Sequence, residues 1–230
     1  MSSLVGQSLG RYQIVAQLGE GGMAAVYKAF DTRLERHVAL KVILPNFQIS
    51  NQFLKRFERE AKALAQLSHP NIVKVHDYGE YTLPGEDQPI PYLVMEYLPG
   101  GTLKERAGKP RPYQDAAKLL LPVARALEYA HQRGVLHRDV KPANILITLE
   151  GAPMLSDFGI AKILEKQGLT QLTNTGVGIG TPEYMAPEQG MGKEVDHRAD
   201  IYALGIVFFE MLTGQKPYRA DTPMAVVIKH

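Results

Sequence analysis

Cysteine and tryptophan are absent from the 230 residues. Without cysteine the chain forms neither disulfide bonds nor thiolate metal sites, which fits a reducing compartment. An excess of one charge is missing too, since 26 Lys and Arg are balanced by 24 Asp and Glu, for a net charge of +2. The sequence therefore gives no electrostatic indication of a nucleic-acid partner.

Long hydrophobic runs are also missing. Residues 201–212 form the longest apolar stretch, but Glu210 interrupts it and it is shorter than the ~20 residues that span a bilayer. The first six residues lack the basic and apolar regions of a signal peptide. We expect a cytoplasmic segment without membrane contact, which leaves open that a full-length protein is anchored through a segment outside these residues.

The composition that remains is ordinary for a soluble globular protein, with 45% hydrophobic and 22% charged residues. The length is sufficient for one large domain or for two smaller lobes, each with its own core.

Strand signals dominate the first third of the chain. Alternating apolar residues from Tyr12 predict one strand, and residues 26–30 and 38–43 predict two more. The run Leu18-Gly19-Glu20-Gly21-Gly22-Met23-Ala24-Ala25-Val26 joins the first two strands. Its glycines allow backbone N–H groups to approach phosphate oxygens, although a glycine cluster in a hairpin is also simply a tight turn. Lys41 lies on the third strand, on the same face as Ala39.

A helix is predicted over residues 51–67, because Phe53, Phe57, Ala61 and Leu64 recur at helical spacing and Pro70 follows. Its charged face carries Glu58 and Glu60. Either carboxylate is a candidate partner for Lys41 by position alone.

Two further strands are predicted at residues 72–75 and 92–95, joined by a polar loop over residues 81–91. Composition changes abruptly around residues 95–101, with strands before and helices after. We therefore expect two domains, a β-rich part at residues 1–97 and a mostly helical part at residues 98–230.

In the second part, apolar spacing predicts a helix over residues 116–133 that ends at Gly134. Pro122 falls inside it and predicts a kink or a break, a conflict that the pattern leaves open. Short strands are expected at residues 145–147 and 154–155. Another helix is expected to begin at Asp200, with an apolar stripe of Leu204, Val207, Phe208 and Met211.

The most informative stretch is His137-Arg138-Asp139-Val140-Lys141-Pro142-Ala143-Asn144. A lone aspartate in a loop commonly caps a turn. In this setting Asp139 could accept a proton from a hydroxyl, Lys141 could neutralise phosphate charge and Asn144 could hold a metal ion.

Together these motifs resemble the protein kinase family. The glycine run, Val38-Ala39-Leu40-Lys41, the 137–144 loop, Asp157-Phe158-Gly159 and Gly180–Glu188 occur in the family's order, and they look most like those of bacterial eukaryotic-like Ser/Thr kinases. The resemblance implies a two-lobed α+β kinase-like fold that transfers the γ-phosphoryl group of ATP to protein Ser or Thr. It also implies that the chain ends before the family's last helices.

The resemblance assigns roles residue by residue. It implies that Asp139 is the catalytic base, that Lys141 assists it, and that Lys41 pairs with Glu60 rather than Glu58. Mg²⁺ or Mn²⁺ is expected on Asn144 and Asp157. Asp200 is expected to anchor the backbone of the catalytic loop, although an ordinary helix cap is compatible with its position. ATP contacts are expected from Leu18, Gly19, Gly21, Val26, Ala39, Lys41, Met95, Glu96, Leu98 and Leu146, with Met95 otherwise simply a core residue.

Residues 160–179 resemble an activation loop that carries Thr173 and Thr175 as autophosphorylation sites, whose phosphate Arg138 is expected to bind. Thr181 is expected to position a Ser or Thr acceptor. The implied partners are protein substrates and a second copy of the chain for autophosphorylation in trans. A catalytically inactive ATP-binding scaffold of the same fold is the alternative, and a small-molecule phosphotransferase is a further one.

Overall fold

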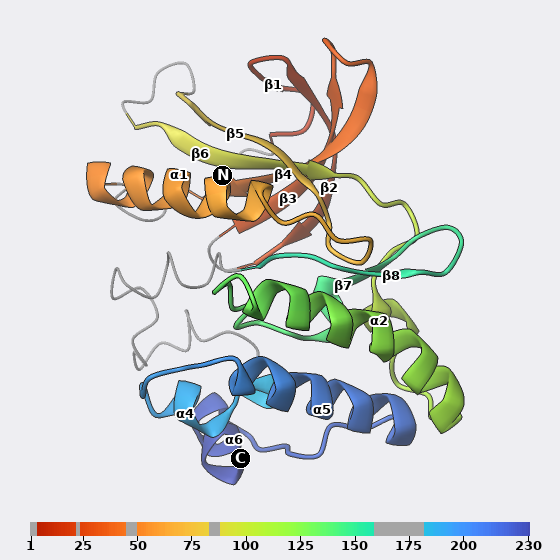
Figure 1. Ribbon diagram of the computed structural model, residues 1–230. Coiled ribbons are helices and arrows are strands. Elements are labelled where there is room, and N and C mark those ends of the chain that lie inside the picture. Colours follow the sequence, from red (N-terminus) through yellow and green to blue (C-terminus); the bar gives the residue numbers. More distant parts are fainter. Residues whose placement is uncertain (1–3, 22–23, 45–49, 83–87, 159–181) are drawn as a thin grey trace. The chain divides into compact units, whose positions relative to one another are not determined.

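A computed structural model describes residues 4–21, 24–44, 50–82, 88–158 and 182–230. The backbone divides into two units (Figure 1), one formed by residues 4–68 and 73–97 and the other by residues 69–72 and 98–230. Within the described residues no helix is long and apolar enough to cross a membrane.

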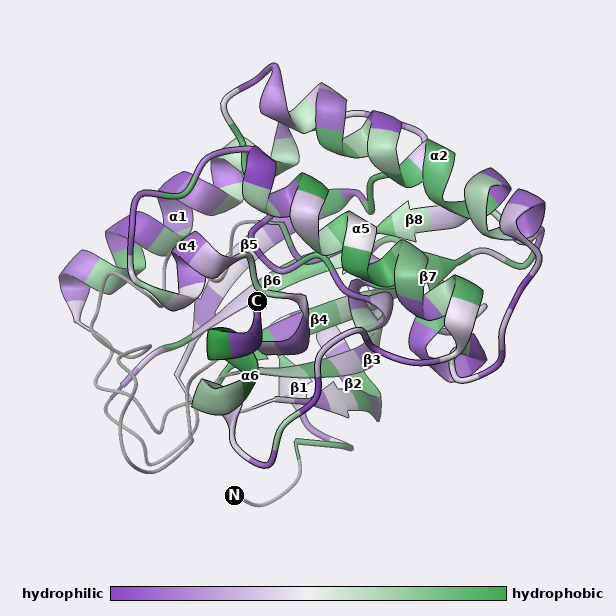
Figure 2. Cartoon of the chain, turned by 90° about the horizontal axis from the view of Figure 1, so that it is seen from below, coloured by the Kyte–Doolittle hydropathy of each residue, from purple (hydrophilic) through white to green (hydrophobic). Residues whose placement is uncertain are grey.

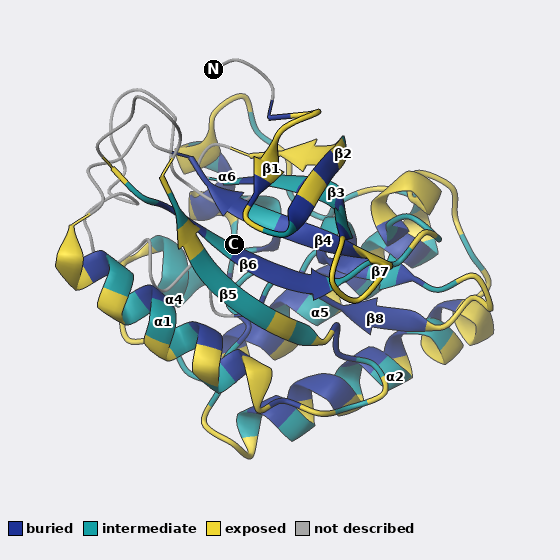
Figure 3. Cartoon of the chain, turned by 90° about the horizontal axis from the view of Figure 1, so that it is seen from above, coloured by how far each residue is buried: buried dark blue, intermediate teal, exposed yellow. Residues whose placement is uncertain are grey.

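The first unit is built on an antiparallel sheet of six strands in the order β1-β2-β3-β4-β6-β5. The strands are β1 (Ser8–Leu9), β2 (Tyr12–Glu20), β3 (Ala24–Asp31), β4 (Arg36–Ile43), β5 (Val75–Tyr81) and β6 (Ile90–Glu96). Burial alternates strictly along β3, as expected for a strand whose two faces meet different surroundings. The central strands β4 and β6 are largely buried, whereas the edge strand β5 is mostly half-buried (Figure 3).

The register of β3 and β4 places their buried side chains in one cluster. Ala25, Tyr27 and Ala29 of β3 project into a buried cluster with Val38, Leu40 and Val42 of β4. Because side chains alternate between faces, Val26, Lys28, Lys41 and other residues between these positions lie away from that cluster. The cluster therefore lies on one face of the sheet, and the residues between these positions lie on the other face.

Helix α1 (Asn51–Ala65) follows β4 and lies alongside β5 and β6 (Figure 1). It buries Phe53, Phe57, Ala61 and Leu64, which confirms the predicted apolar stripe. The hydroxyl of Ser50 caps the helix by accepting a bond from the Phe53 N–H at 3.1 Å.

The second unit is mostly helical. Its elements are η1 (Leu103–Arg106), α2 (Tyr113–His131), η2 (Pro142–Asn144), β7 (Ile145–Ile147), β8 (Pro153–Leu155), η3 (Pro182–Tyr184), α4 (Pro187–Gly190), α5 (Arg198–Thr213) and α6 (Pro223–Lys229). Helices α2 and α5 pack against each other, and α2 also contacts β8. Apolar residues occur along most of α5 (Figure 2), as is typical of a helix with neighbours on several sides.

Three expectations from the sequence need correction. The strand predicted at residues 72–75 is wrong, because β5 begins at Val75. Ile72 instead pairs with Leu155 of β8, and the Asn71 side chain donates to the Pro153 carbonyl at 2.8 Å. These contacts of the second unit outweigh the local strand propensity.

Helix α2 continues through Pro122 without the break that was one of the two predicted outcomes. Proline frees the carbonyl four residues earlier, which belongs to the exposed Lys118, where water can bond to it. Packing of six buried side chains on the opposite face keeps the helix intact: Ala116, Leu120, Val123, Ala126, Leu127 and Ala130.

Helix α5 begins two residues before the predicted start. Its N-cap is His197, so Asp200 lies in the first turn and is not the cap. The predicted stripe is only partly right, since Val207 and Met211 are buried while Leu204 and Phe208 are half-buried. The other buried residues of α5 are Ala199, Asp200, Ala203 and Ile206.

Candidate active site

The face of the sheet that carries Lys41 gathers several predicted nucleotide contacts. Strand register places Val26 of β3 directly opposite Lys41 of β4, and Ala39 of β4 opposite Met95 of β6. Residues directly opposite each other on neighbouring strands share a face. Val26, Ala39, Lys41 and Met95 therefore lie on one face, although they come from three separate strands.

The glycine run forms the connection between β2 and β3. Gly19 pairs with Val26, and the N–H of Gly21 donates to the Ala24 carbonyl at 2.9 Å, which closes the turn. A Cβ added to Gly19 would meet no atom within 4 Å, so open space borders this backbone. Leu18 is exposed beside it. The backbone at Gly19 therefore faces open space.

The two candidate carboxylates of α1 differ in their surroundings. Glu58 is bonded to Lys62 at 2.7 Å and to the Tyr78 hydroxyl at 3.0 Å. Glu60 is half-buried and precedes the buried Ala61. Because Glu58 is already engaged by other groups, the geometry favours Glu60 as the partner of Lys41, and their ion pair stays a prediction.

The end of β6 carries the expected adenine contacts. Glu96 is the last residue of the strand, pairs with Val38, and its N–H donates to the Lys74 carbonyl at 2.9 Å. Leu98 begins the long segment of the second unit, where Leu146 of β7 is half-buried between Met154 and Thr102.

In the second unit, the 137–144 loop brings an acid, a cation and an amide together. Lys141 Nζ lies 2.7 Å from Oδ2 of Asp139. The side-chain amide of Asn144 donates to the same oxygen at 3.0 Å and to the Asp139 carbonyl at 2.8 Å. The Asp139 side chain is 31% exposed. A fixed, partly exposed carboxylate of this kind is suited to accept a proton from a docking hydroxyl.

Asp200 anchors the start of this loop through hydrogen bonds to its backbone. It is 1% exposed, and its carboxylate accepts bonds from the backbone N–H of His137 at 2.8 Å and of Arg138 at 2.7 Å. The Nε2–H of His131 donates to it at 2.7 Å. Burial alone would raise the pKa of Asp200, but these bonds stabilise the anion and hold its pKa below the ordinary value. The predicted anchoring role is confirmed.

His137 links this loop to the segment around Asp157. Its Nε2–H donates to the Ser156 carbonyl at 2.7 Å, and its Nδ1 accepts the N–H of Asp139 at 3.2 Å. Its ring also packs against the buried Phe158 at 4.6 Å. Complete burial lowers the pKa of His137, which agrees with a neutral ring that donates through one nitrogen and accepts through the other.

Two residues near the reacting groups adopt the left-handed backbone conformation. Arg138 and Asp157 both have φ of 67°, a region that costs a non-glycine residue free energy. Hydrogen bonds from other elements hold such a conformation in place, and for Arg138 one of these comes from Asp200.

Asn144 and Asp157 have the donor chemistry for a magnesium ion. Ser156 donates to the Asn144 carbonyl through its N–H at 2.9 Å and its hydroxyl at 3.1 Å, which ties the two segments together. The amide nitrogen of Asn144 faces Asp139, so its side-chain oxygen points elsewhere. In the described part of the chain no three His, Cys, Asp or Glu gather as a metal cage. Magnesium is commonly held by one or two side chains together with substrate phosphates, so the pair fits it.

The segment before α4 is anchored to α5. The Tyr184 hydroxyl donates to Glu210 at 2.6 Å, and Lys216 pairs with Glu183 at 2.9 Å. Burial, together with the neighbouring Glu210 carboxylate, raises the pKa of Tyr184. Thr173, Thr175 and Thr181 lie outside the described residues.

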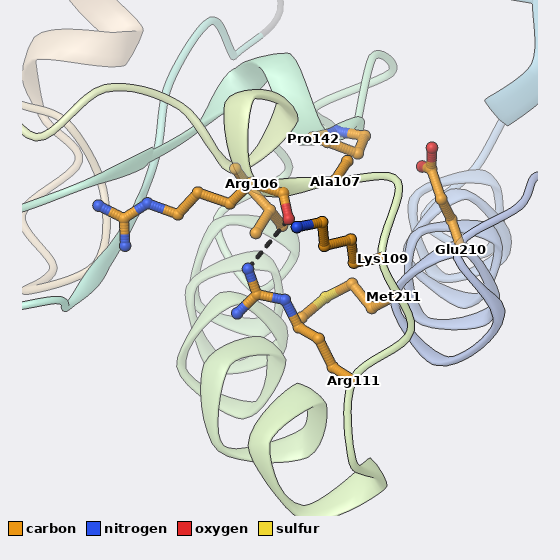
Figure 4. Close-up of a pocket in the computed structure, with 8 residues that line it drawn as sticks. Arg106, Ala107, Lys109, Arg111, Pro142, Glu210 and Met211 are labelled. Atoms are coloured by element: carbon orange, nitrogen blue, oxygen red, sulfur yellow. Dashed lines mark hydrogen bonds between the residues drawn. The ribbon is translucent and has the colours of Figure 1, made fainter.

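A small cavity also lies within the second unit (Figure 4), lined by Leu103, Arg106, Ala107, Lys109, Arg111, Pro142, Glu210 and Met211. Arg111 donates to the Arg106 carbonyl at 3.0 Å, and the Glu210 carboxylate is engaged by Tyr184. These polar groups are occupied with protein partners, so the cavity belongs to the scaffold beneath the loop.

Several residues that shape the site could not be found from the sequence motifs. Ser156 and Gln189 bond directly to the 137–144 loop, and His131 bonds to the Asp200 that anchors it, but the sequence patterns assigned these roles to none of the three. Ser156 borders Asp157, which is the nearest signal that the sequence offered. Their roles become visible only once the chain is folded.

The β-rich unit with Lys41 on its sheet and the helical unit with the Asp139 loop are the two parts of a protein kinase domain. The family model described as "Protein kinase domain" matches residues 12–230. The chain belongs to this family, and the predicted kinase-like α+β fold is confirmed.

Named relatives and a solved structure agree. The chain is 43% identical over 222 residues to the serine/threonine-protein kinase PknB of Mycobacterium leprae, covering 96% of this chain and 35% of the relative. It is 42% identical to the probable serine/threonine-protein kinase PknB of Bifidobacterium longum, covering 96% and 33%. The crystal structure of the Mycobacterium tuberculosis PknI kinase domain aligns with a TM-score of 0.72 and 33% identity, covering 96% of this chain and 81% of that one. The chain thus spans about a third of the curated relatives' length.

Proposed function

We propose that this chain is the catalytic domain of a Ser/Thr protein kinase, which transfers the γ-phosphoryl group of ATP to a Ser or Thr hydroxyl of a protein. The observation that carries the proposal is the Asp139 carboxylate, which Lys141 and Asn144 orient while it remains partly exposed. Relatives named as serine/threonine-protein kinases over almost the whole chain support it.

The chemistry follows from these positions. The acceptor oxygen attacks the γ-phosphorus, the bond from that phosphorus to the β–γ bridging oxygen breaks, and ADP leaves. Asp139 accepts the hydroxyl proton, and Lys141 stabilises the negative charge on the transferred group. Lys41 binds the α- and β-phosphates and is positioned by Glu60. Magnesium, held by Asn144 and Asp157, supplies charge neutralisation at the phosphates when bound.

The sheet face that carries Lys41 binds the rest of the nucleotide. In the first unit the proposed adenine contacts are Val26, Ala39, Met95 and the backbone of Glu96. In the second unit they are Leu98 and Leu146. Leu18, Gly19 and Gly21 cover the phosphates. The room beside Gly19 supports this placement.

The acceptor class rests on sequence features next to Asp139. Lys141-Pro142-Ala143 and Thr181 resemble the pattern of Ser/Thr kinases rather than Tyr kinases. We also propose that Thr173 and Thr175 are phosphorylated by a second copy of the chain, and that Arg138 then pairs with the phosphate.

Phosphate transfer with magnesium and ATP tests the proposal. Wild type should phosphorylate itself and a Ser/Thr protein substrate, and Asp139→Asn should lower kcat by about 10²–10⁴-fold, the usual contribution of a general base. Asp221→Asn, an exposed aspartate of the same unit, is the matched control and should behave as wild type.

Two results would contradict the proposal. Wild type that binds ATP but transfers no phosphate would favour the inactive scaffold, and equal rates in wild type and Asp139→Asn would exclude Asp139 as the base. Mass spectrometry of the product locates the phosphate, and its absence from both Thr173 and Thr175 would refute those two sites.

A further inference from the structure

Gln189 of α4 contacts the catalytic loop 51 residues before it. Its amide nitrogen donates to the Arg138 carbonyl at 3.0 Å, and its amide oxygen accepts the Ala186 N–H at 3.1 Å. The side chain therefore bridges the start of its own short helix and the residue that precedes the catalytic aspartate.

The bond to the Arg138 carbonyl acts on the orientation of Asp139. The carbonyl of Arg138 and the N–H of Asp139 belong to one rigid peptide plane. Gln189 holds the carbonyl end of this plane and Nδ1 of His137 holds its N–H end. On the other side of Arg138, its own N–H is bonded to Asp200.

The strained backbone of Arg138 requires these hydrogen bonds. Arg138 has φ of 67°, which costs a non-glycine residue free energy. Its N–H is bonded to α5 and its carbonyl to α4, so both of its backbone polar groups are held by side chains from distant elements. Without one of these bonds, the peptide before Asp139 could relax to a more favourable conformation and turn the carboxylate away.

The amide orientation of Gln189 follows from its two partners. The Ala186 N–H requires an acceptor and the Arg138 carbonyl requires a donor, and the reverse orientation would oppose like groups at both ends. Glutamate would serve equally well at this third position of a helix, where Glu and Gln both accept from the N-cap N–H. Only glutamine also supplies the donor that Arg138 needs.

Gln189 directly follows the segment Gly180–Glu188, which the resemblance assigns to acceptor positioning. This segment is anchored by the Tyr184 bond to Glu210, and Ala186 is buried just before α4. A single side chain thus connects the acceptor segment to the peptide that orients the base.

We propose that Gln189 is a positioning residue that fixes the peptide before Asp139 and holds the acceptor segment in register with it. The inference rests on the proposed kinase activity and deepens it, because it states how the base is aimed at the hydroxyl.

Gln189→Glu tests the donor alone, since it keeps the size and the acceptor oxygen. At about pH 7.5 we expect kcat for peptide phosphorylation to fall about 10–100-fold, because small misplacements of a reacting group carry penalties of that order. The KM for ATP should stay within about twofold of the wild-type value, since the residues around Lys41 bind ATP independently of Gln189.

The pH profile separates positioning from packing. A protonated carboxyl regains an O–H donor toward Arg138, so the deficit of Gln189→Glu relative to wild type should shrink as the pH falls toward about 5.5. Gln189→Met lacks both polar atoms and should lose kcat similarly, with no recovery at low pH. Gln114→Glu, an exposed position on α2, makes the same charge change and should match wild type.

Hydrogen exchange provides a readout that needs no activity. In Gln189→Glu and Gln189→Met we expect faster exchange of the amides of residues 137–139, with the buried face of α2 unchanged. If wild type transfers no phosphate and the exchange of residues 137–139 still changes in the variants, the proposed function is wrong. The role of Gln189 in fixing the peptide before Asp139 is supported in that case. If Gln189→Glu loses protection from hydrogen exchange throughout the second unit, that variant is unfolded, and the exchange and kcat of Gln189→Met then test the inference.

The inference is overturned if exchange of residues 137–139 is the same as in wild type in the folded variants. It is equally overturned if an active wild type and both Gln189 variants have kcat values within about twofold of each other.

Discussion

Replacing Asp200 by alanine should destabilise the second unit more than any surface substitution in it. The carboxylate accepts the backbone N–H groups of His137 and Arg138, and Asp200 is 1% exposed. Alanine cannot accept a hydrogen bond, so two donors lose their partner where little water reaches them. At ~1–3 kcal/mol for each unsatisfied donor, the expected loss is roughly 2–6 kcal/mol of the free energy of unfolding.

Asparagine at this position should cost less. It can accept one backbone bond through Oδ1 but presents an N–H to the other donor, so we expect about half of the alanine effect, roughly 1–3 kcal/mol. Asp221→Ala is the control, because Asp221 is exposed and such substitutions usually change stability by less than ~0.5 kcal/mol.

The assay is urea denaturation followed by far-UV circular dichroism, since the chain contains no tryptophan to report by fluorescence. A loss for Asp200→Ala no larger than that for Asp221→Ala would refute the reasoning. It would mean that the two backbone donors find other partners and that Asp200 is not what holds the loop.

The dependence on pH provides a second check. The pKa of Asp200 is depressed in the folded state by its three hydrogen bonds, in spite of burial, which alone would raise it. A carboxyl whose pKa is lowered in the folded state stabilises the fold above its unfolded pKa of about 3.9. This stabilisation is lost as the pH falls through the folded-state pKa. The difference between wild type and Asp200→Ala should therefore be constant from about pH 7 to 5 and narrow below about pH 4.

Two further substitutions test other parts of the site. Glu60→Gln should lower kcat/KM at least about tenfold in a peptide phosphorylation assay. Glu58→Gln should stay near wild type, since an exposed helix pair such as Glu58–Lys62 contributes little. The reverse order would make Glu58 the partner of Lys41. Tyr184→Phe removes the donor to Glu210 and should reduce the free energy of unfolding by about 1–3 kcal/mol in the same urea titration, because the bond joins a buried hydroxyl to a carboxylate. No change on Tyr184→Phe would show that the acceptor segment is anchored by other contacts.

Much of the fold was predictable because its signals are local. Alternating apolar residues from Tyr12 marked β2, strand signals at residues 26–30 and 38–43 marked β3 and β4, and helical spacing marked α1 and α2. Each element was found within a few residues of its ends. The strand at residues 72–75 was predicted wrongly because Asn71 and Ile72 take their partners from β8, some 82 residues away in the Asn71 bond to Pro153. A pattern within one window carries no information about such a partner.

The sequence by itself determined the chemistry of this protein, since the order of the glycine run, Lys41, Asp139, Asn144 and Asp157 along the chain is characteristic of the family. Only the tertiary structure decided what holds those groups in place. Asp200 and Gln189 bond to Arg138 from α5 and α4, from 62 and 51 residues away. The physical reason is that reactive groups must be of particular types. A backbone N–H, in contrast, can bond to any side-chain acceptor that the fold places nearby, and a backbone carbonyl to any side-chain donor.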